Sequence, residues 1–242
     1  MGSTAGSFLA DLPTPEPGSE AKLLVASADC KGVPLVKEDA AKVAAFEVSK
    51  KNPGNRRMAT VASVYTVDPH IRTAEDITAA LFRDEPEAEA VKVKRPKPQN
   101  KNTTAHFPRT EDDGLGGAFA ISGIHVAMAW IIGQVALRRR SGHVLIALLD
   151  GQENRWETMK LHLSFGVRTV PILDIIHALA YVWEADGLFE KADAARKAFI
   201  RACLLRILRG EVRGVSRACL CDRRKSPNPP PTCVVVSFFA RA

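Results

Sequence analysis

The sequence lacks the cysteine patterns of a disulfide-stapled or zinc-binding protein. It has five cysteines in 242 residues. Cys30 and Cys203 stand alone, and Cys219, Cys221 and Cys233 fall in one stretch without the paired spacing of zinc ligands. An odd number of scattered thiols also argues against a disulfide framework. We therefore expect neither disulfides nor a zinc ion.

The sequence also lacks signals for entry into a membrane. Its first residues have no basic flank followed by an apolar stretch, so we expect no signal peptide and a cytoplasmic location. Residues 118–137 are apolar for about the length of a bilayer span, but polar residues interrupt them and no second span accompanies them. We expect this stretch to be a buried helix and the membrane not to be a partner.

The chain has a moderate excess of positive charge. The chain has 34 Lys and Arg residues and 27 Asp and Glu residues, which gives a formal net charge of +7. A basic protein favours polyanionic partners such as nucleic acid. The hydrophobic content of 46% is enough for one substantial α/β core at this length.

Composition divides the chain into four parts. Residues 1–21 are rich in Pro, Gly and Ser, which predicts a flexible leader. Residues 22–187 should form the folded core, with a long basic surface loop at 84–117. Residues 188–214 show helical spacing and should begin a helical insertion. Residues 215–242 change character, and we expect an irregular tail that is out of frame or belongs to a truncated gene.

Apolar runs and turn residues predict three antiparallel strands at the start of the core. Residues 23–29 have the pattern of a buried strand that ends in an acid. Residues 41–50 and 57–67 indicate two further strands, joined by a turn that contains Pro and Gly. A helix should then begin after Thr73, which can form a capping box with Asp76.

The second half of the core alternates helices and strands. Residues 118–140, 152–164 and 174–185 predict helices, and residues 143–150 and 167–173 predict buried strands. Such a β-α-β-α succession requires parallel strands with helices packed on the sheet. The expected fold class is therefore α/β, with a mixed sheet of antiparallel and parallel strands flanked by helices.

Two aspartates end apolar strands that are far apart in the sequence, Asp29 and Asp150. A sheet can bring them side by side, where two carboxylates repel each other unless a cation lies between them. Mg²⁺ or Mn²⁺ suits such oxygen ligands, and two ions can drive phosphoryl chemistry. Each aspartate can equally serve as a turn or cap residue, and spacing alone leaves both interpretations open.

Five segments together resemble the Kra-type insertion-sequence (ISKra) transposases. They lie between about residues 22 and 214, and they are SADCKGVP (27–34), KKNPGNRRMATVASVYTVDPHIRT (50–73), RPKPQNKN (95–102), LLDGQENRW (148–156) and ILDIIHALAYVWEA (172–185). The resemblance implies a DDE transposase with an RNase H-like core, Mg²⁺ or Mn²⁺ as cofactor and DNA as partner. It also implies Asp29 as the first and Asp150 as the second catalytic acid. Cys30 stands where a glycine is usual after the first acid.

Asp174 and His177 are similar to the acid-x-x-His motif of Mutator-related transposases. Three residues apart, they lie on one helix face, where the carboxylate can orient the imidazole or both can contact DNA. The alternative is an N-cap aspartate beside a partly buried histidine.

The family's third acid is a glutamate on a helix further along the chain. Three glutamates lie in or near the helical region, but none sits in a recognisable motif, and none is assigned: Glu184, Glu190 and Glu211. We therefore expect an incomplete metal site and an inactive chain.

Five cations cluster near the end of the first strand and the following turn, and they are Lys31, Lys50, Lys51, Arg56 and Arg57. They can contact the phosphate backbone of DNA or form a solvated loop. Trp156 and Trp183 are expected to be core anchors rather than base-stacking platforms. The leading hypothesis is a transposase fragment. The alternatives are a non-catalytic remnant that binds DNA or forms a homodimer, and a nuclease that hydrolyses DNA without strand transfer.

Overall fold

The computed structural model describes residues 15–16, 18–43, 55–83, 94–151, 153–163, 169–186, 193–213 and 215. The chain divides into two compact units. The first comprises Met1–Pro69 and Pro96–Ile172, and the second comprises His70–Arg95 and Leu173–Ala242.

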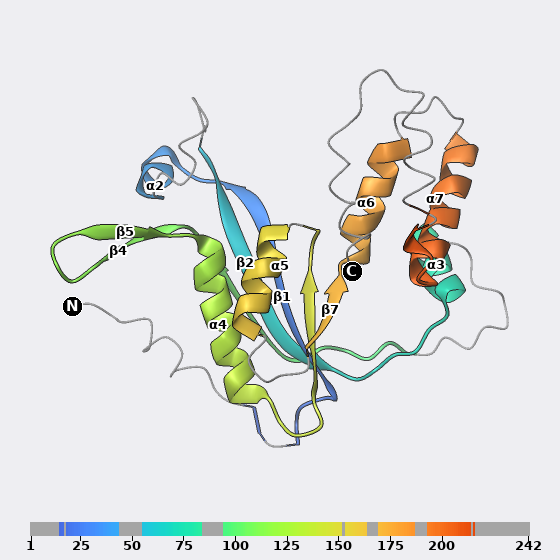
Figure 1. The fold of residues 1–242 in the computed structure, drawn as a ribbon, viewed down its shortest axis with the longest axis horizontal. Helices are drawn as coiled ribbons and strands as arrows, with labels where there is room; N and C mark the ends of the chain where they lie inside the picture. Colours follow the sequence, from blue (N-terminus) through green and yellow to red (C-terminus); the bar gives the residue numbers. More distant parts are fainter. Residues whose placement is uncertain are drawn as a thin grey trace. The chain divides into compact units, whose positions relative to one another are not determined.

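The first unit is built on a five-stranded sheet with the strand order β3-β2-β1-β6-β7 (Figure 1). β1 (Leu23–Pro34) pairs antiparallel with β2 (Arg56–Val67), which pairs antiparallel with β3 (Gln99–His106). On its other side β1 pairs in parallel with β6 (Val144–Leu149), and β7 (Thr169–Leu173) lies next to β6. The expected α/β class with a mixed sheet is confirmed.

Two helices cover one face of this sheet (Figure 1). α4 (Gly123–Arg138) packs on β1, β2 and β3, while α5 (Glu153–Leu163) packs on β6 and against α4. The N-cap of α4 is Ser122, whose hydroxyl accepts a hydrogen bond from the backbone of His125. The helix therefore starts later than the expected 118. No helix in the described part of the chain combines the length and the apolar character that a bilayer crossing needs.

The region expected as a long basic loop, 84–117, contains strands in its described part, 94–117, so that prediction is wrong there, and residues 84–93 lie outside the described residues. β3 lies within it, and β4 (Arg109–Asp112) pairs antiparallel with β5 (Ala118–Ile121) in a separate two-stranded sheet. β3 has the sequence QNKNTTAH and is the edge strand of the main sheet. Edge strands are often polar, so the alternation that signals a half-buried strand is absent.

The prediction of a strand at 41–50 is wrong for its first two residues, because they belong to the helix α2 (Lys37–Lys42). Its sequence, KEDAAK, consists mostly of helix formers with acids in the first turn, which suits the positive end of the helix. Residues 44–50 lie outside the described part of the chain. The third antiparallel strand of the sheet is β3.

The second unit contains the helices α3 (Ala74–Phe82), α6 (Ile175–Asp186) and α7 (Asp193–Leu208). The predicted capping box of α3 is present. Thr73 Oγ1 accepts from the backbone of Asp76 and Asp76 Oδ2 accepts from the backbone of Thr73, both at 3.0 Å. The buried residues at the centre of this unit come from α6, α7 and the segment after them, and they are Val182, Ile200, Cys203 and Val215.

A buried ion pair ties the start of the first unit to the end of α4. Glu20 Oε1 accepts from Arg138 Nη2 at 2.8 Å and from Nε at 3.0 Å, and the two side chains are 7% and 1% exposed. Arg138 also donates to the carbonyl of Val64 on β2 at 3.0 Å. Glu20 and Ala21 belong to the expected leader, yet both side chains are buried.

Replacing Arg138 by methionine should lower the free energy of unfolding by about 3–5 kcal/mol, because the Glu20 carboxylate then stays buried without its cation. Urea unfolding followed by tryptophan fluorescence measures this change. Arg140→Met removes an exposed arginine two residues further on and should cost less than about 1 kcal/mol. Equal midpoints for the two variants would show that the ion pair contributes nothing.

Candidate active site

The parallel pairing of β1 with β6 places Asp29 and Asp150 side by side. This ladder runs from Leu23 opposite Val144 to Ala28 opposite Leu149. Asp29 is therefore the next residue of β1 beyond this ladder, and Asp150 directly follows β6. β1 itself continues along β2 to Pro34, so Asp29 ends only the pairing with β6 and not the strand.

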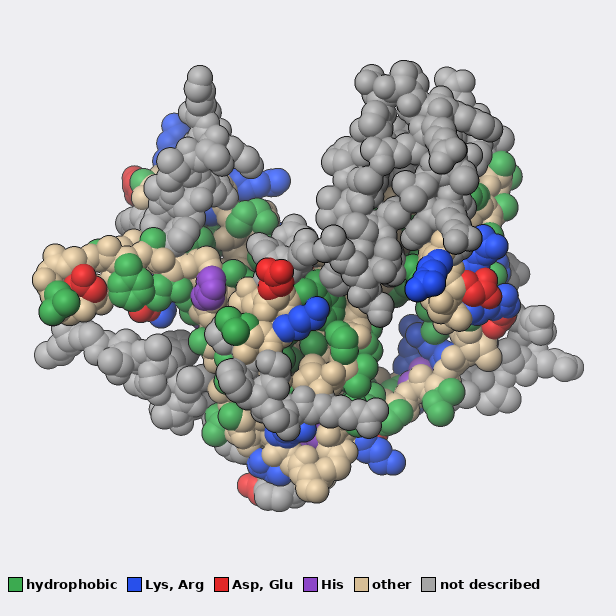
Figure 2. All heavy atoms as spheres, viewed as in Figure 1, with side chains coloured by type: hydrophobic (Ala, Val, Ile, Leu, Met, Phe, Trp, Pro, Cys, Tyr) green, Lys and Arg blue, Asp and Glu red, His purple; other side chains and the backbone are tan. Residues whose placement is uncertain are grey.

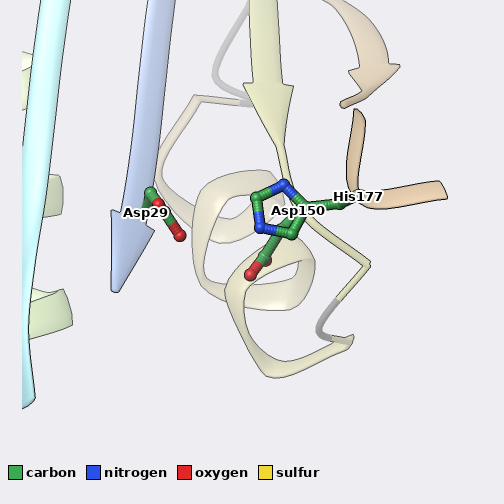
Figure 3. Close-up of side chains that lie close together, drawn as sticks. All are labelled: Asp29, Asp150 and His177. Carbon is green, nitrogen blue, oxygen red and sulfur yellow. The ribbon is translucent and has the colours of Figure 1, made fainter. Parts of the chain in front are cut away.

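The two carboxylates converge, as the sequence predicts. A carboxylate oxygen of Asp29 and one of Asp150 lie within 4.8 Å of each other. Figure 3 shows the two side chains directed toward one another, Asp29 from β1 and Asp150 from the residue that follows β6. The Asp29 side chain is 55% exposed, whereas that of Asp150 is 10% exposed. One acid is therefore open to solvent and the other is held inside the protein.

Arg155, which the sequence analysis did not single out, lies between these two acids. Its Nη1 donates to Asp150 Oδ2 and lies 3.7 Å from Asp29 Oδ1. The arginine side chain is only 6% exposed. A buried guanidinium thus neutralises part of the charge of the pair.

Backbone and indole groups fix the position of each acid. Trp156 is 3% exposed, and its Nε1 donates to the backbone carbonyl of Asp150 at 2.9 Å, which confirms the predicted core role of this residue. The backbone amide of Cys30 donates to Asp29 Oδ1 at 2.7 Å. Cys30 pairs with Thr60 in the ladder and does not have a positive φ, so the cysteine at this position causes no backbone strain.

Asp174 and His177 contact each other within the second unit, where Nδ1 of the histidine lies 3.3 Å from Oδ2 of the aspartate. Asp174 Oδ1 also accepts from the backbone of Ile176 at 2.8 Å, as an N-cap residue does. The cap and the carboxylate–imidazole contact are therefore both present. Figure 3 also labels His177.

The described residues of the first unit bring no third carboxylate to Asp29 and Asp150. Glu211 is exposed in the second unit, where its Oε2 lies 3.7 Å from Arg206 Nε. Glu190 and the side chain of Glu184 lie outside the described part of the chain. The third acid stays unassigned.

The expected DNA-binding cations differ in how they are held. Lys31 and Arg56 are exposed, and the Arg56 side chain lies against Gly32 on the neighbouring strand. Arg57 is half-buried and donates to the carbonyl of Ala40 at 3.0 Å, which indicates a structural role. Lys50 and Lys51 lie outside the described part of the chain. On the face of the first unit drawn in Figure 2, the described Lys and Arg side chains lie in several separate places.

No family model, curated protein or solved structure matches this chain. The basis for a functional proposal is therefore the site itself. Two carboxylates within 4.8 Å offer the hard oxygen ligands that Mg²⁺ and Mn²⁺ prefer, so the donor set fits such an ion.

The two acids should differ in their effect on stability. Asp150→Ala leaves the buried Arg155 guanidinium without its main partner and should cost about 3–5 kcal/mol. Asp29→Ala removes an exposed carboxylate 3.7 Å from the same guanidinium, and should cost less than about 1 kcal/mol. Urea unfolding of both variants checks this order. A larger loss for Asp29→Ala would contradict the arrangement described here.

Proposed function

We propose that this chain carries the core of a DDE-type DNA transposase related to the Kra-type insertion-sequence transposases. The observation that carries the proposal is the approach of Asp29 and Asp150 to within 4.8 Å where the pairing of β1 with β6 ends. The sheet supports an RNase H-like interpretation, because three antiparallel strands in the order β3-β2-β1 are followed by β6, parallel to β1, and then β7. Helices α4 and α5 precede and follow β6, as a β-α-β-α succession requires.

The reaction proposed for this fold is hydrolysis of a phosphodiester bond at an element end, followed by displacement at a target phosphate by the freed 3′-OH. A bound divalent ion supplies charge stabilisation at the phosphate and a more reactive attacking oxygen. Asp29 and Asp150 are the residues that would hold it. The buried Asp150, fixed through Trp156 and Arg155, provides the rigid side of the site, and the exposed Asp29 faces the substrate.

The extension of β1 beyond β6 is suited to hold a DNA strand next to Asp29. Successive side chains on a strand alternate between its two faces, so Asp29 and Lys31 project from the same face of β1. Both are exposed. A phosphate that reaches Asp29 therefore has a cation within reach two residues further along the strand.

A specific observation favours the non-catalytic alternative. Arg155 already neutralises part of the carboxylate charge, and no third carboxylate joins the pair among the described residues of the first unit. With two assigned acids, strand cleavage by this chain should be weak or absent. The second candidate function is therefore a remnant that binds DNA, alone or as a homodimer, without cutting it.

Metal binding tests the role of the two acids. Mn²⁺ titration followed by electron paramagnetic resonance should show a site that weakens at least about tenfold in Asp29→Asn and in Asp150→Asn. Asp68→Asn, which changes an exposed aspartate at the end of β2, is the matched control and should bind like the unchanged protein. Identical titrations for all four proteins would remove Asp29 and Asp150 from any metal site.

A donor-end assay separates the candidate functions. The protein is incubated with Mn²⁺, a short duplex with a free 3′-OH and a supercoiled plasmid. Joined products support a transposase, whereas nicked plasmid without joining supports a nuclease. If the protein binds DNA but forms neither product, and Asp150→Asn binds DNA equally well, the result supports the non-catalytic remnant.

Lys31 is expected to contact a DNA phosphate. Lys31→Gln should reduce the slope of log K against log salt by about 0.9, the value for one phosphate contact on duplex DNA. Lys22→Gln changes an exposed lysine just before the opposite end of β1 and is the control. Fluorescence anisotropy with a labelled duplex at several salt concentrations gives both slopes. Equal slopes would place the DNA elsewhere on the protein.

A further inference from the structure

Arg155 occupies a position that needs an explanation. It lies in the first turn of α5, which begins at Glu153. The first turn of a helix carries the positive end of the helix dipole, so a cation there is disfavoured. Burial adds to this cost, because a guanidinium stays charged in proteins and only 6% of this side chain is exposed. An anion has to compensate both effects, and Asp150 does so directly.

The guanidinium and a divalent ion would require the same oxygens. Arg155 Nη1 contacts Asp150 Oδ2 and lies 3.7 Å from Asp29 Oδ1, and the latter oxygen also accepts from the amide of Cys30. An ion held by both acids would therefore sit next to a fixed positive charge. Like charges at such a distance repel, and the burial of Arg155 and Asp150 limits the screening of this repulsion by water.

We propose that Arg155 is the resident counter-ion of the Asp29–Asp150 pair and that it competes with divalent ions for these carboxylates. The inference rests on the proposed function, since it concerns the control of the same site. Through this competition, one side chain would lower the affinity of the two carboxylates for a divalent ion. The pair is held together by a guanidinium in the resting protein, and a divalent ion binds both acids only when the guanidinium gives up its contacts.

The test compares Mn²⁺ binding and metal-dependent melting of the full chain with those of Arg155→Met. Methionine keeps much of the apolar length of the side chain and removes the charge. The variant should bind Mn²⁺ about tenfold more tightly than the unchanged protein, or better. Its melting temperature should rise with MnCl₂, because the ion replaces the lost cation, whereas that of the unchanged protein should change little.

Two controls make the result specific. Arg140→Met removes an exposed arginine and should leave Mn²⁺ affinity unchanged, which excludes a general effect of net charge. Arg155→Met combined with Asp150→Asn should lose the gain, because the variant then lacks one of the two acids. A gain that persists in the double variant overturns the proposal.

The remaining outcomes are also decisive. If the unchanged protein binds Mn²⁺ as tightly as Arg155→Met, the inference is wrong and the proposed metal site stands. If neither protein binds Mn²⁺, the inference and the metal site both fail. If Arg155→Met does not fold without metal, refolding is measured with and without MnCl₂. Recovery only with the ion supports the proposal, and equal failure in both overturns it.

Discussion

The register between β1 and β6 is the constraint on which the candidate site depends. Three buried cross-strand pairs fix it: Leu24 with Leu145, Ala26 with Ala147, and Ala28 with Leu149. A slip of one residue would turn these apolar side chains to the other face of the sheet, away from α4 and α5. The same slip would separate the acids. Apolar packing that contains no functional residue thus sets the distance between the two carboxylates.

The two acids are chemically unequal although the sequence presents them alike. Each follows a short apolar run, yet one side chain is 55% exposed and the other 10%. Asp29 stays at the surface because β1 continues past its ladder with β6 and pairs there only with β2. After Asp150 the chain enters α5, whose residues Arg155 and Trp156 contact Asp150 and bury it. Asp150 is therefore a part of the interior, and its role in stability cannot be separated from any role in chemistry.

The sequence predicted the elements that have a strong local signal. The apolar strand at 143–150, the helix after it and the capping box at Thr73 all follow from patterns within a few residues. β3 was missed because a polar edge strand lacks the alternation of apolar and polar residues that marks a strand. Its pairing with β2 is a long-range contact that no local pattern reveals. The convergence of Asp29 and Asp150 was predictable from strand ends. The position of Arg155 was not, because its significance depends on a β1 strand that is remote in sequence. The sequence does show an arginine in the first turn of a helix that follows an acid at the end of a strand. That pattern alone does not distinguish a buried arginine from an exposed one.

A guanidinium beside two converging carboxylates also offsets the repulsion between them from within the chain. Two acids at this distance destabilise each other unless one is protonated or a cation intervenes. Arg155 provides that cation from within the chain, so the fold of the first unit does not need a metal ion to keep the acids together. The geometry of the acids is therefore compatible with a protein that binds a divalent ion at this pair and with one that does not. The two cases differ in whether an ion can displace the guanidinium from the carboxylates. Displacement depends on two opposing free energies, the binding of the ion to two carboxylates and the cost of leaving a buried arginine without its partner.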